Sequence, residues 1–343
     1  MSPAATGESG LTYILPLKSA VPDPGDELAA YLSWLSTRAE VIVVDGSTAD
    51  VFNAHTAQWQ ENLNRGLVHV APDHETPMGK VGGVLTGLRL ASHERVIIAD
   101  DDVRYDDESL DRIACALGTV DVVRPQNYFD PMPWHALWDT GRTLLNRVSG
   151  GDWPGTLAVR RSVLRATNGY DGRALFENLE LVRTVVAAGG RETALLDAYV
   201  RRRPSSVRHF WSQRVRQAYD EMARPARYIL QLAALPVVLW LAIAGRWLVL
   251  LIIAAVIMIA AEIGRRRGGG ARVFPARAAI FAPVWALERA VCIWLALGAR
   301  VLWGGVPYRG QVVRHAATPM RTLMARHAEA RNHRPRESGD RSA

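Results

Sequence analysis

The stretch of the sequence most able to do chemistry is Asp100-Asp101-Asp102, three carboxylates that follow an apolar run at 96–99. The run predicts a buried strand, so the carboxylates gather where a sheet meets solvent. Charges this close raise each other's pKa, which is costly unless a cation such as a divalent metal lies beside them. The alternative is a surface turn whose aspartates cap a helix starting near Asp107, the commoner outcome for an isolated triplet.

Two other predicted strands also end in residues that could contact a ligand. An apolar run at 11–17 is followed by Lys18, and a second run at 40–45 ends in Asp45. The next residues, Gly46-Ser47-Thr48, supply turn and helix-capping chemistry. Because ligands of parallel sheets bind beyond the carboxyl ends of the strands, these residues and the acidic triplet are expected to face one site.

The elements that must position these residues alternate between strand and helix. Continuous apolar strands separated by helices predict an α/β fold, a Rossmann-like and mostly parallel sheet with helices on both faces. Further strands are expected at 67–71, 120–124, 156–160 and 193–196, and helices at 27–37, 79–90, 134–148, 174–188 and 210–222. The helix at 134–148 carries an aromatic stripe typical of a core, and the basic, amphipathic helix at 210–222 suits a membrane surface.

Composition indicates a globular part joined to a more apolar one. Hydrophobic residues make up 49% of the 343 residues, and the net charge is +7. The basic residues concentrate around the apolar C-terminal third, which favours an anionic membrane over nucleic acid as the partner. Cys115 and Cys292 have no metal-like spacing, which fits a reducing, cytoplasmic setting. Residues 1–10 lack a signal-peptide pattern and are expected to be a short disordered tail.

The C-terminal third predicts membrane segments. Residues 226–264 form two apolar runs joined by a tight turn, long enough for a transmembrane hairpin. The loop at 265–277 carries five arginines, which places it and the domain at 11–225 in the cytoplasm. Residues 278–310 predict a helix that lies in the interface or crosses a third time; Glu288-Arg289 in its middle favours the interface. Residues 311–343 are expected to be a basic tail, disordered from about Ala328.

Four features in order carry a resemblance to a known family. Pro16 ends the first strand, Val44-Asp45-Gly46-Ser47-Thr48 follows the second, Gly79-Lys80 opens a long helix, and Asp100-Asp101-Asp102 follows the next strand. Together they resemble the nucleotide-sugar-binding half of family 2 glycosyltransferases of the GT-A fold. The similarity continues through residues 159–163, 168–171, 177–181 and 213–217, and the membrane segments resemble the group that includes ceramide and hopanoid glucosyltransferases.

The resemblance implies roles for individual residues. Asp100 and Asp102 match the outer aspartates of the family's DxD element, where Mg²⁺ or Mn²⁺ bridges to the donor diphosphate. Gln213 and Arg216 match the family's Q-x-x-R-W, whose arginine can fork onto the pyrophosphate. Asp45 matches a partner of the donor base, and Lys80 matches a contact near the nucleotide. The other positions that match the donor-binding half are Pro16, Lys18, Ser47 and Asp101.

Two positions depart from the family pattern. Gln217 stands where the Q-x-x-R-W element has tryptophan, which argues against a processive polymerase. Asn178 stands where the family has the aspartate that deprotonates the acceptor hydroxyl, and an amide cannot accept that proton at neutral pH. The base is therefore expected to be Glu177, which remains at the motif, or Glu180 one turn further on.

The sequence predicts a membrane-anchored inverting glycosyltransferase on the cytoplasmic side of the cell membrane. It is expected to move a sugar from a UDP- or GDP-sugar to a lipid or lipid-linked acceptor with Mg²⁺ or Mn²⁺, and to bind no nucleic acid. The nearest alternative is a transferase to polyprenyl phosphate. The other is a catalytically silent nucleotide-sugar-binding scaffold at the membrane, which Asn178 keeps open.

Overall fold

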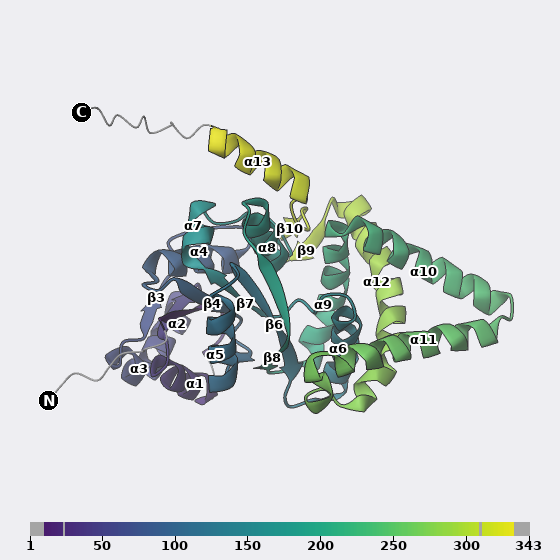
Figure 1. Ribbon diagram of the computed structural model, residues 1–343, viewed down its shortest axis with the longest axis horizontal. Helices are drawn as coiled ribbons and strands as arrows, with labels where there is room; N and C mark the ends of the chain where they lie inside the picture. Colours follow the sequence, from purple (N-terminus) through teal and green to yellow (C-terminus); the bar gives the residue numbers. More distant parts are fainter. Residues whose placement is uncertain (1–9, 23–24, 309–310, 333–343) are drawn as a thin grey trace.

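The computed structural model describes residues 10–22, 25–308 and 311–332 (Figure 1). Most of the predicted N-terminal tail and the last residues of the C-terminal tail lie outside these ranges. The remaining chain forms an α/β domain followed by long apolar helices, and in Figure 1 those helices extend away from the sheet on one side.

The central sheet has eight strands in the order β3-β2-β1-β4-β7-β6-β8-β5. Six of the strands run in the same direction, and only β7 and β5 run against their neighbours. The predicted mostly parallel sheet is thus confirmed. The strands are β1 Leu11–Leu17, β2 Glu40–Asp45, β3 Val68–Val70, β4 Arg95–Ala99, β5 Val103–Arg104, β6 Val122–Phe129, β7 Thr156–Arg160 and β8 Glu192–Arg202.

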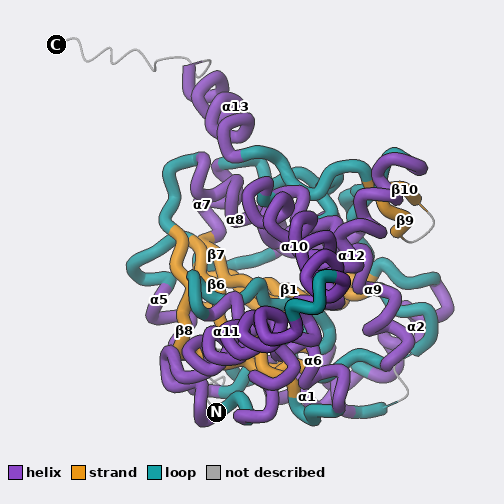
Figure 2. Tube along the Cα trace, turned by 90° about the vertical axis from the view of Figure 1, so that its right-hand side faces the viewer, coloured by secondary structure: helices purple, strands orange, loops and turns teal. Residues whose placement is uncertain are grey.

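Helices cover both faces of the sheet, because the strands are apolar on both sides. One core holds Ile14 and Val44 against α4 and α8, and the other holds Tyr13 and Val43 against α1 and α5. Figure 2 shows the orange strands lying among the purple helices. The helices of this domain are α1 Glu27–Ser36, α2 Ala49–Gln58, α3 Gln60–Asn64, α4 Gly79–Leu90, α5 Asp107–Ala116, α6 Trp134–Arg147, α7 Arg161–Ala166, α8 Glu177–Ala187 and α9 Val207–Tyr219.

Among the described residues, three helices of the C-terminal third are long and apolar enough to cross a membrane, within 225–243, 247–272 and 276–303. The helices α10 and α11 run out together as a hairpin, whereas α12 runs across the base of that hairpin, against the α/β domain (Figure 1). The elements here are η1 Asp220–Ala223, α10 Pro225–Ile243, α11 Trp247–Arg266, η2 Arg267–Arg272, η3 Ala276–Ile280, α12 Phe281–Trp303, β9 Val306–Tyr308, β10 Gln311–Val313 and α13 Met320–Asn332.

Three expectations about the elements were wrong in detail. The aromatic stripe on α6 is only partly core, because Leu137 and Leu144 are buried whereas Trp134 is 45% exposed. Disorder was predicted from Ala328 onward, but residues 328–332 are helical, because α13 continues to Asn332. The strand expected at 193–196 is the first half of β8, which continues to Arg202 because β6 pairs with it along its length past a bulge.

Candidate active site

The acidic triplet lies in the turn between β4 and β5 and does not cap α5. The cap is Asp106, whose side chain accepts a hydrogen bond from the backbone N–H of Ser109 at 2.8 Å, and the Ser109 hydroxyl accepts one from the Asp106 N–H at 2.9 Å. The helix start therefore has its own capping box. The surface-turn reading in which the triplet serves α5 is excluded, and its carboxylates are available for another purpose.

Lys80 joins the triplet to α8. Its Nζ lies 2.6 Å from Asp100 Oδ1 and 2.9 Å from Glu177 Oε1. Desolvation alone lowers the pKa of this ammonium group, but the charges of Asp100 and Glu177 outweigh it and raise the pKa well above its ordinary value. The first turn of α4, which begins at Gly79, thus carries a fixed positive charge at the carboxyl end of the sheet.

Arg202, at the end of β8, is a site residue that sequence reasoning missed. Its Nε lies 2.9 Å from Asp102 Oδ2, and its Nη2 lies 3.4 Å from Asp100 Oδ2. Burial raises the pKa of Asp102, whereas Lys80 and Arg202 overcome the same effect on Asp100 and hold its pKa below the usual value. The only sequence signal was the run Arg201-Arg202-Arg203 next to a strand that was predicted too short.

One carboxylate oxygen of the triplet is buried and free to bind a cation. Asp102 Oδ1 is buried and has no hydrogen-bond partner, although the other carboxylate oxygen of this residue binds Arg202. Among the described residues, no group of three or more His, Cys, Asp or Glu side chains could hold a metal by itself. A cation at Asp102 must therefore take most of its ligands from water or a bound phosphate group, which is how Mg²⁺ is commonly held.

Asp45 and Ser47 shape the loop after β2. Asp45 is buried, with Oδ2 2.7 Å from His55 Nδ1 and 3.3 Å from His69 Nε2, while Oδ1 accepts the Ser47 N–H at 2.9 Å. Burial raises the pKa of this carboxyl, but the hydrogen bonds from His69, Ser47 and His55 lower it far more. The Ser47 hydroxyl accepts the N–H of Ser19 at 2.9 Å. Both side chains act within the loop and do not line the cavities described next.

A cavity of about 940 Å³ opens at the carboxyl ends of the strands and holds the other predicted residues. Pro16, Lys18, Lys80 and the triplet line this cavity together with residues of α9. On α9, Arg216 Nε donates to Gln213 Oε1 at 2.5 Å, and the Arg216 guanidinium lies 5.2 Å from the centre of the Tyr308 ring. The residues from the sequence prediction that line it are Pro16, Lys18, Lys80, Asp100, Asp101, Asp102, Glu177, Gln213 and Arg216.

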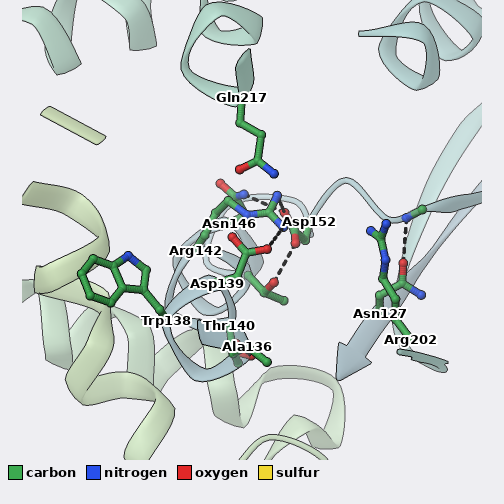
Figure 3. Close-up of polar contacts among 12 residues, drawn as sticks. Asn127, Ala136, Trp138, Asp139, Thr140, Arg142, Asn146, Asp152, Arg202 and Gln217 are labelled. Carbon is green, nitrogen blue, oxygen red and sulfur yellow. Dashed lines mark hydrogen bonds and ion pairs between the residues drawn. The ribbon is translucent and has the colours of Figure 1, made fainter. Parts of the chain in front are cut away.

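A second, smaller cavity of about 220 Å³ also reaches Asp100 and Asp102 and is lined by residues of α6, α9 and α12. Figure 3 shows part of it, with the Gln217 amide directed toward the polar side chains of α6. These are paired with one another: Arg142 lies 3.2 Å from Asp152, and Asn146 donates to the same carboxylate at 2.8 Å. The two cavities share Asp100, Asp102, Glu177, Arg202, His209, Gln213 and Arg216.

The two candidate bases occupy different places. Glu177 lines both cavities, next to Lys80. Glu180 is fully buried, lines neither cavity, and accepts the N–H of Thr318 through Oε2 at 2.6 Å. Asn178 lines the small cavity and donates from Nδ2 to the Pro154 carbonyl at 3.0 Å. Glu180 therefore ties α8 to the segment before α13, and Glu177 is the carboxylate of the two that can meet a ligand.

The fold is GT-A-like: a mostly parallel sheet with helices on both faces and an acidic turn at the carboxyl ends of its strands. Residues 28–165 match the family Glycosyl transferase family 2. This part of the chain is a family 2 glycosyltransferase domain, so the predicted enzyme class is confirmed.

Several solved structures are similar to the chain. The mannosyltransferase PcManGT from Pyrobaculum calidifontis, in complex with GDP-Man and Mn²⁺, is 18% identical, with 85% of this chain and 90% of that chain covered and a TM-score of 0.49. TarS 1-349 from S. aureus is 17% identical over 61% and 64%, with a TM-score of 0.40.

Glucosyl-3-phosphoglycerate synthase from Mycobacterium tuberculosis, with Mn²⁺, UDP-glucose and phosphoglyceric acid, is 17% identical over 61% and 76%, with a TM-score of 0.39. No curated protein matches the chain. All three TM-scores are below 0.5, so the assignment to the family depends on the family match and on the fold itself.

Proposed function

We propose that the protein is a membrane-bound inverting glycosyltransferase that moves a sugar from a UDP- or GDP-sugar to a lipid or lipid-linked acceptor. The observation that carries this proposal is the pair of cavities that meet at Asp100, Asp102 and Glu177. A displacement at an anomeric carbon needs the donor on one side of the reacting centre and the acceptor on the other. The larger cavity supports the donor side, because it has the volume for a drug-sized ligand and carries Lys18, Lys80 and Arg216.

The larger cavity offers cationic groups that would bind the donor diphosphate. Lys80 lies at the first turn of α4, where backbone N–H groups and the helix dipole also favour phosphate. Arg216 faces the same space and offers a planar guanidinium that can bind two phosphate oxygens. Asp45 and Ser47 would support the nucleotide indirectly, through the conformation of the loop at Gly46, which does line the cavity.

A divalent cation fits beside the triplet, and Asp100 and Asp102 are the residues that would hold it. The unpartnered Asp102 Oδ1 supports this assignment. A bound Mg²⁺ or Mn²⁺ would neutralise charge on the leaving diphosphate. Mn²⁺ also accompanies the nucleotide sugars in PcManGT and in the glucosyl-3-phosphoglycerate synthase. Arg202 already holds both carboxylates, so it fixes their orientation and would shift when a cation binds.

The membrane assignment is supported by the C-terminal helices. The outward faces of α10 and α11 expose many large apolar side chains, which suits a spanning hairpin. The helix α12 crosses the base of that hairpin, with one face against the domain and the other apolar and exposed, so we assign it to the interface (Figure 1). Trp134 and Trp211 lie exposed nearby, as aromatic residues at a bilayer surface do.

Binding of the donor tests this function directly. The purified protein in detergent micelles is heated with each of a panel of UDP- and GDP-sugars, with and without Mn²⁺. A true donor raises the melting temperature, and Mn²⁺ enlarges the shift. Asp102→Asn should lose the Mn²⁺-dependent part, whereas Asp111→Asn, an exposed carboxylate on α5, should keep it. A panel without any shift would refute the proposal. Binding without sugar transfer to any lipid would favour the silent scaffold.

A further inference from the structure

The small cavity contains a buried cation without an acidic partner. Arg289, from the middle of α12, is 2% exposed and lines this cavity. Its Nε and Nη1 atoms have no hydrogen-bond partner, and its Nη2 lies 3.5 Å from the neutral Gln217 Oε1. The guanidinium carbon also lies 5.3 Å from the centre of the Trp285 ring. The ion pairs formed by the described residues include none with Arg289. A buried guanidinium in this state is costly, all the more on an otherwise apolar helix.

None of the carboxylates around the cavity forms an ion pair with Arg289, although the charges of Glu288 and Glu221 act on its guanidinium. Glu288 faces Arg214 at 3.5 Å and accepts the Trp138 indole N–H at 3.1 Å. The others are also committed, since Asp139 pairs with Arg142 and Arg214, and Glu221 pairs with Arg224 and Arg227. Three carboxylate oxygens here nevertheless have no hydrogen-bond partner, namely Glu288 Oε1, Glu221 Oε2 and Asp220 Oδ1. Burial raises the pKa of Asp220 to about 7, so Asp220 is only partly ionised at neutral pH.

We propose that the small cavity is the acceptor site, that it binds the phosphate group of a lipid phosphate monoester, and that Arg289 is the main cation holding that group. This inference rests on the proposed function. The guanidinium fits the bidentate geometry that phosphate oxygens prefer. The lipid chain has a path along the outer side of α12, where Leu287 and Leu295 are exposed.

A phosphate acceptor also accounts for the two departures from the family pattern. A hydroxyl acceptor needs a base, but Asn178 is an amide and Glu177 is held by Lys80 at 2.9 Å. A phosphate monoester has a second pKa near 6, so its oxygens are already anionic at neutral pH and need no base. Gln217, in place of a tryptophan, offers the group a polar neighbour (Figure 3).

The step balances without a proton transfer. An oxygen of the lipid phosphate forms a bond to the anomeric carbon, while the bond from that carbon to the donor diphosphate breaks. The electron pair of the broken bond leaves with the nucleoside diphosphate. The product is a glycosyl lipid phosphodiester. Glu177 then serves as a positioning residue that orients Lys80, and not as a base.

The test uses the full-length protein in micelles, a donor identified by thermal shift, and two acceptors, phytanyl phosphate and phytanol. We expect transfer to phytanyl phosphate alone, giving a product that mild acid cleaves. Free inorganic phosphate should compete poorly, because it lacks the chain that lies along α12. We would reject a lipid phosphate site if free phosphate inhibited transfer at a concentration equal to the KM for phytanyl phosphate. The site would then bind phosphate without any contribution from the lipid chain.

Arg289→Gln should raise KM for phytanyl phosphate at least about tenfold, which is about 1.4 kcal/mol, while KM for the donor changes less than about twofold. Arg289→Lys should recover part of the loss. Arg277→Gln, an exposed arginine of the same region, is the matched control and should leave both values unchanged. The donor must still raise the melting temperature of all three variants. A variant that keeps this shift is folded and binds the donor, so any change in its acceptor KM is due to the acceptor site alone.

Several results would overturn the inference. One is donor binding without transfer to phytanyl phosphate, and another is an Arg289→Gln protein with an unchanged acceptor KM. A third is transfer to a neutral lipid alcohol whose rate rises with pH around 7 and loses that dependence in Asp220→Asn, because Asp220 would then be the base for a hydroxyl.

Discussion

The larger cavity, our proposed donor cavity, and the smaller one, our proposed acceptor cavity, differ in how their charges are neutralised. In the donor cavity, Lys80 contacts Asp100 and Glu177, and Arg202 contacts Asp100 and Asp102. The acceptor cavity also contains ion pairs, but Arg289 is buried there without one. A cation and a diphosphate would thus rearrange the pairs of the donor cavity, whereas an anion in the acceptor cavity would give Arg289 its first ion pair.

The cavities also differ in where their residues come from. The donor cavity is built mostly from strand ends, first helical turns and α9 of the α/β domain, with Pro307 and Tyr308 of β9 added from the C-terminal third. The acceptor cavity takes residues from α6, α9 and α12, and α12 belongs to the apolar C-terminal third. We infer that the domain supplies the shared donor chemistry and that the membrane helices select the acceptor.

The largest effect is expected where the cavities meet. Replacing Asp100 and Asp102 together by asparagine removes the carboxylates that would hold the cation, and leaves Arg202 without its partners. We expect kcat/KM to fall by about a thousandfold or more, as for loss of a group that stabilises the leaving charge, and the metal dependence to vanish. Steady-state kinetics over a range of Mn²⁺ concentrations measures both. Asp111→Asn is the control, and a double variant with near-normal activity would remove the triplet from the reaction.

Glu177 sharpens the comparison, because the two readings of this residue predict different sizes of effect. As a positioning residue for Lys80, Glu177→Gln should lower kcat about tenfold, since the amide can still accept the Lys80 hydrogen bond. As a general base it should lower kcat by about a hundred- to ten-thousandfold. The pH profile of kcat distinguishes them further: a base gives a rate that falls below its pKa, and loss of that limb in Glu177→Gln would mean that an acceptor proton is removed here.

The sequence predicted much of the donor cavity because its residues follow strands directly. Lys18 and Asp100 come straight after strands whose apolar runs are unmistakable, and Lys80 opens a helix at a glycine. Parallel strands then bring these positions to one edge. Asp45 also stands at the carboxyl end of a strand, yet its side chain does not line the cavity. It binds His55 and His69 instead, and no local sequence pattern predicts these two partners.

The acceptor cavity was beyond sequence reasoning, since its residues meet only through tertiary packing. Glu288-Arg289 was visible as an anomaly in an apolar segment, but its neighbours Gln217 and Arg214 lie about 70 residues away in the chain. Arg202 was missed for a related reason: the length of β8 is set by its pairing with β6 and not by a hydrophobic pattern. In each of these cases the prediction failed because the structure depends on contacts between residues that lie far apart in the chain.

A smaller effect is expected from a substitution at Gly155, which packs against Asp100 and Arg202. A Cβ on Gly155 would lie 2.7 Å from Asp100 Oδ2 and 3.0 Å from the Arg202 guanidinium carbon, too close for either to stay. Gly155→Ala should therefore lower kcat/KM severalfold with little change in melting temperature, because flexible side chain ends can move aside. Gly298→Ala, with no atom nearby to clash, is the matched control. An unaltered rate in Gly155→Ala would mean that the orientation of Asp100 is not critical.

The smallest effect concerns stability on the acceptor side. Asp220 keeps its proton to about pH 7, because burial and the charge of Glu177 outweigh the attraction of Arg216, Arg289 and Arg224. Between pH 4 and 7 the folded protein binds this proton and the unfolded chain does not, so the contribution of Asp220 to stability falls as pH rises. Asp220→Asn should thus raise the melting temperature by a few degrees at pH 8 and by less at pH 5, measured by differential scanning fluorimetry.

Phytanyl phosphate should add more stability to this variant than to the wild type at pH 8, because the bound phosphate then meets Arg289 without a competing carboxylate. A variant less stable at pH 8 than the wild type would show that the ionised Asp220 already serves as the counter-charge of Arg289, and the contrast between the two cavities would disappear.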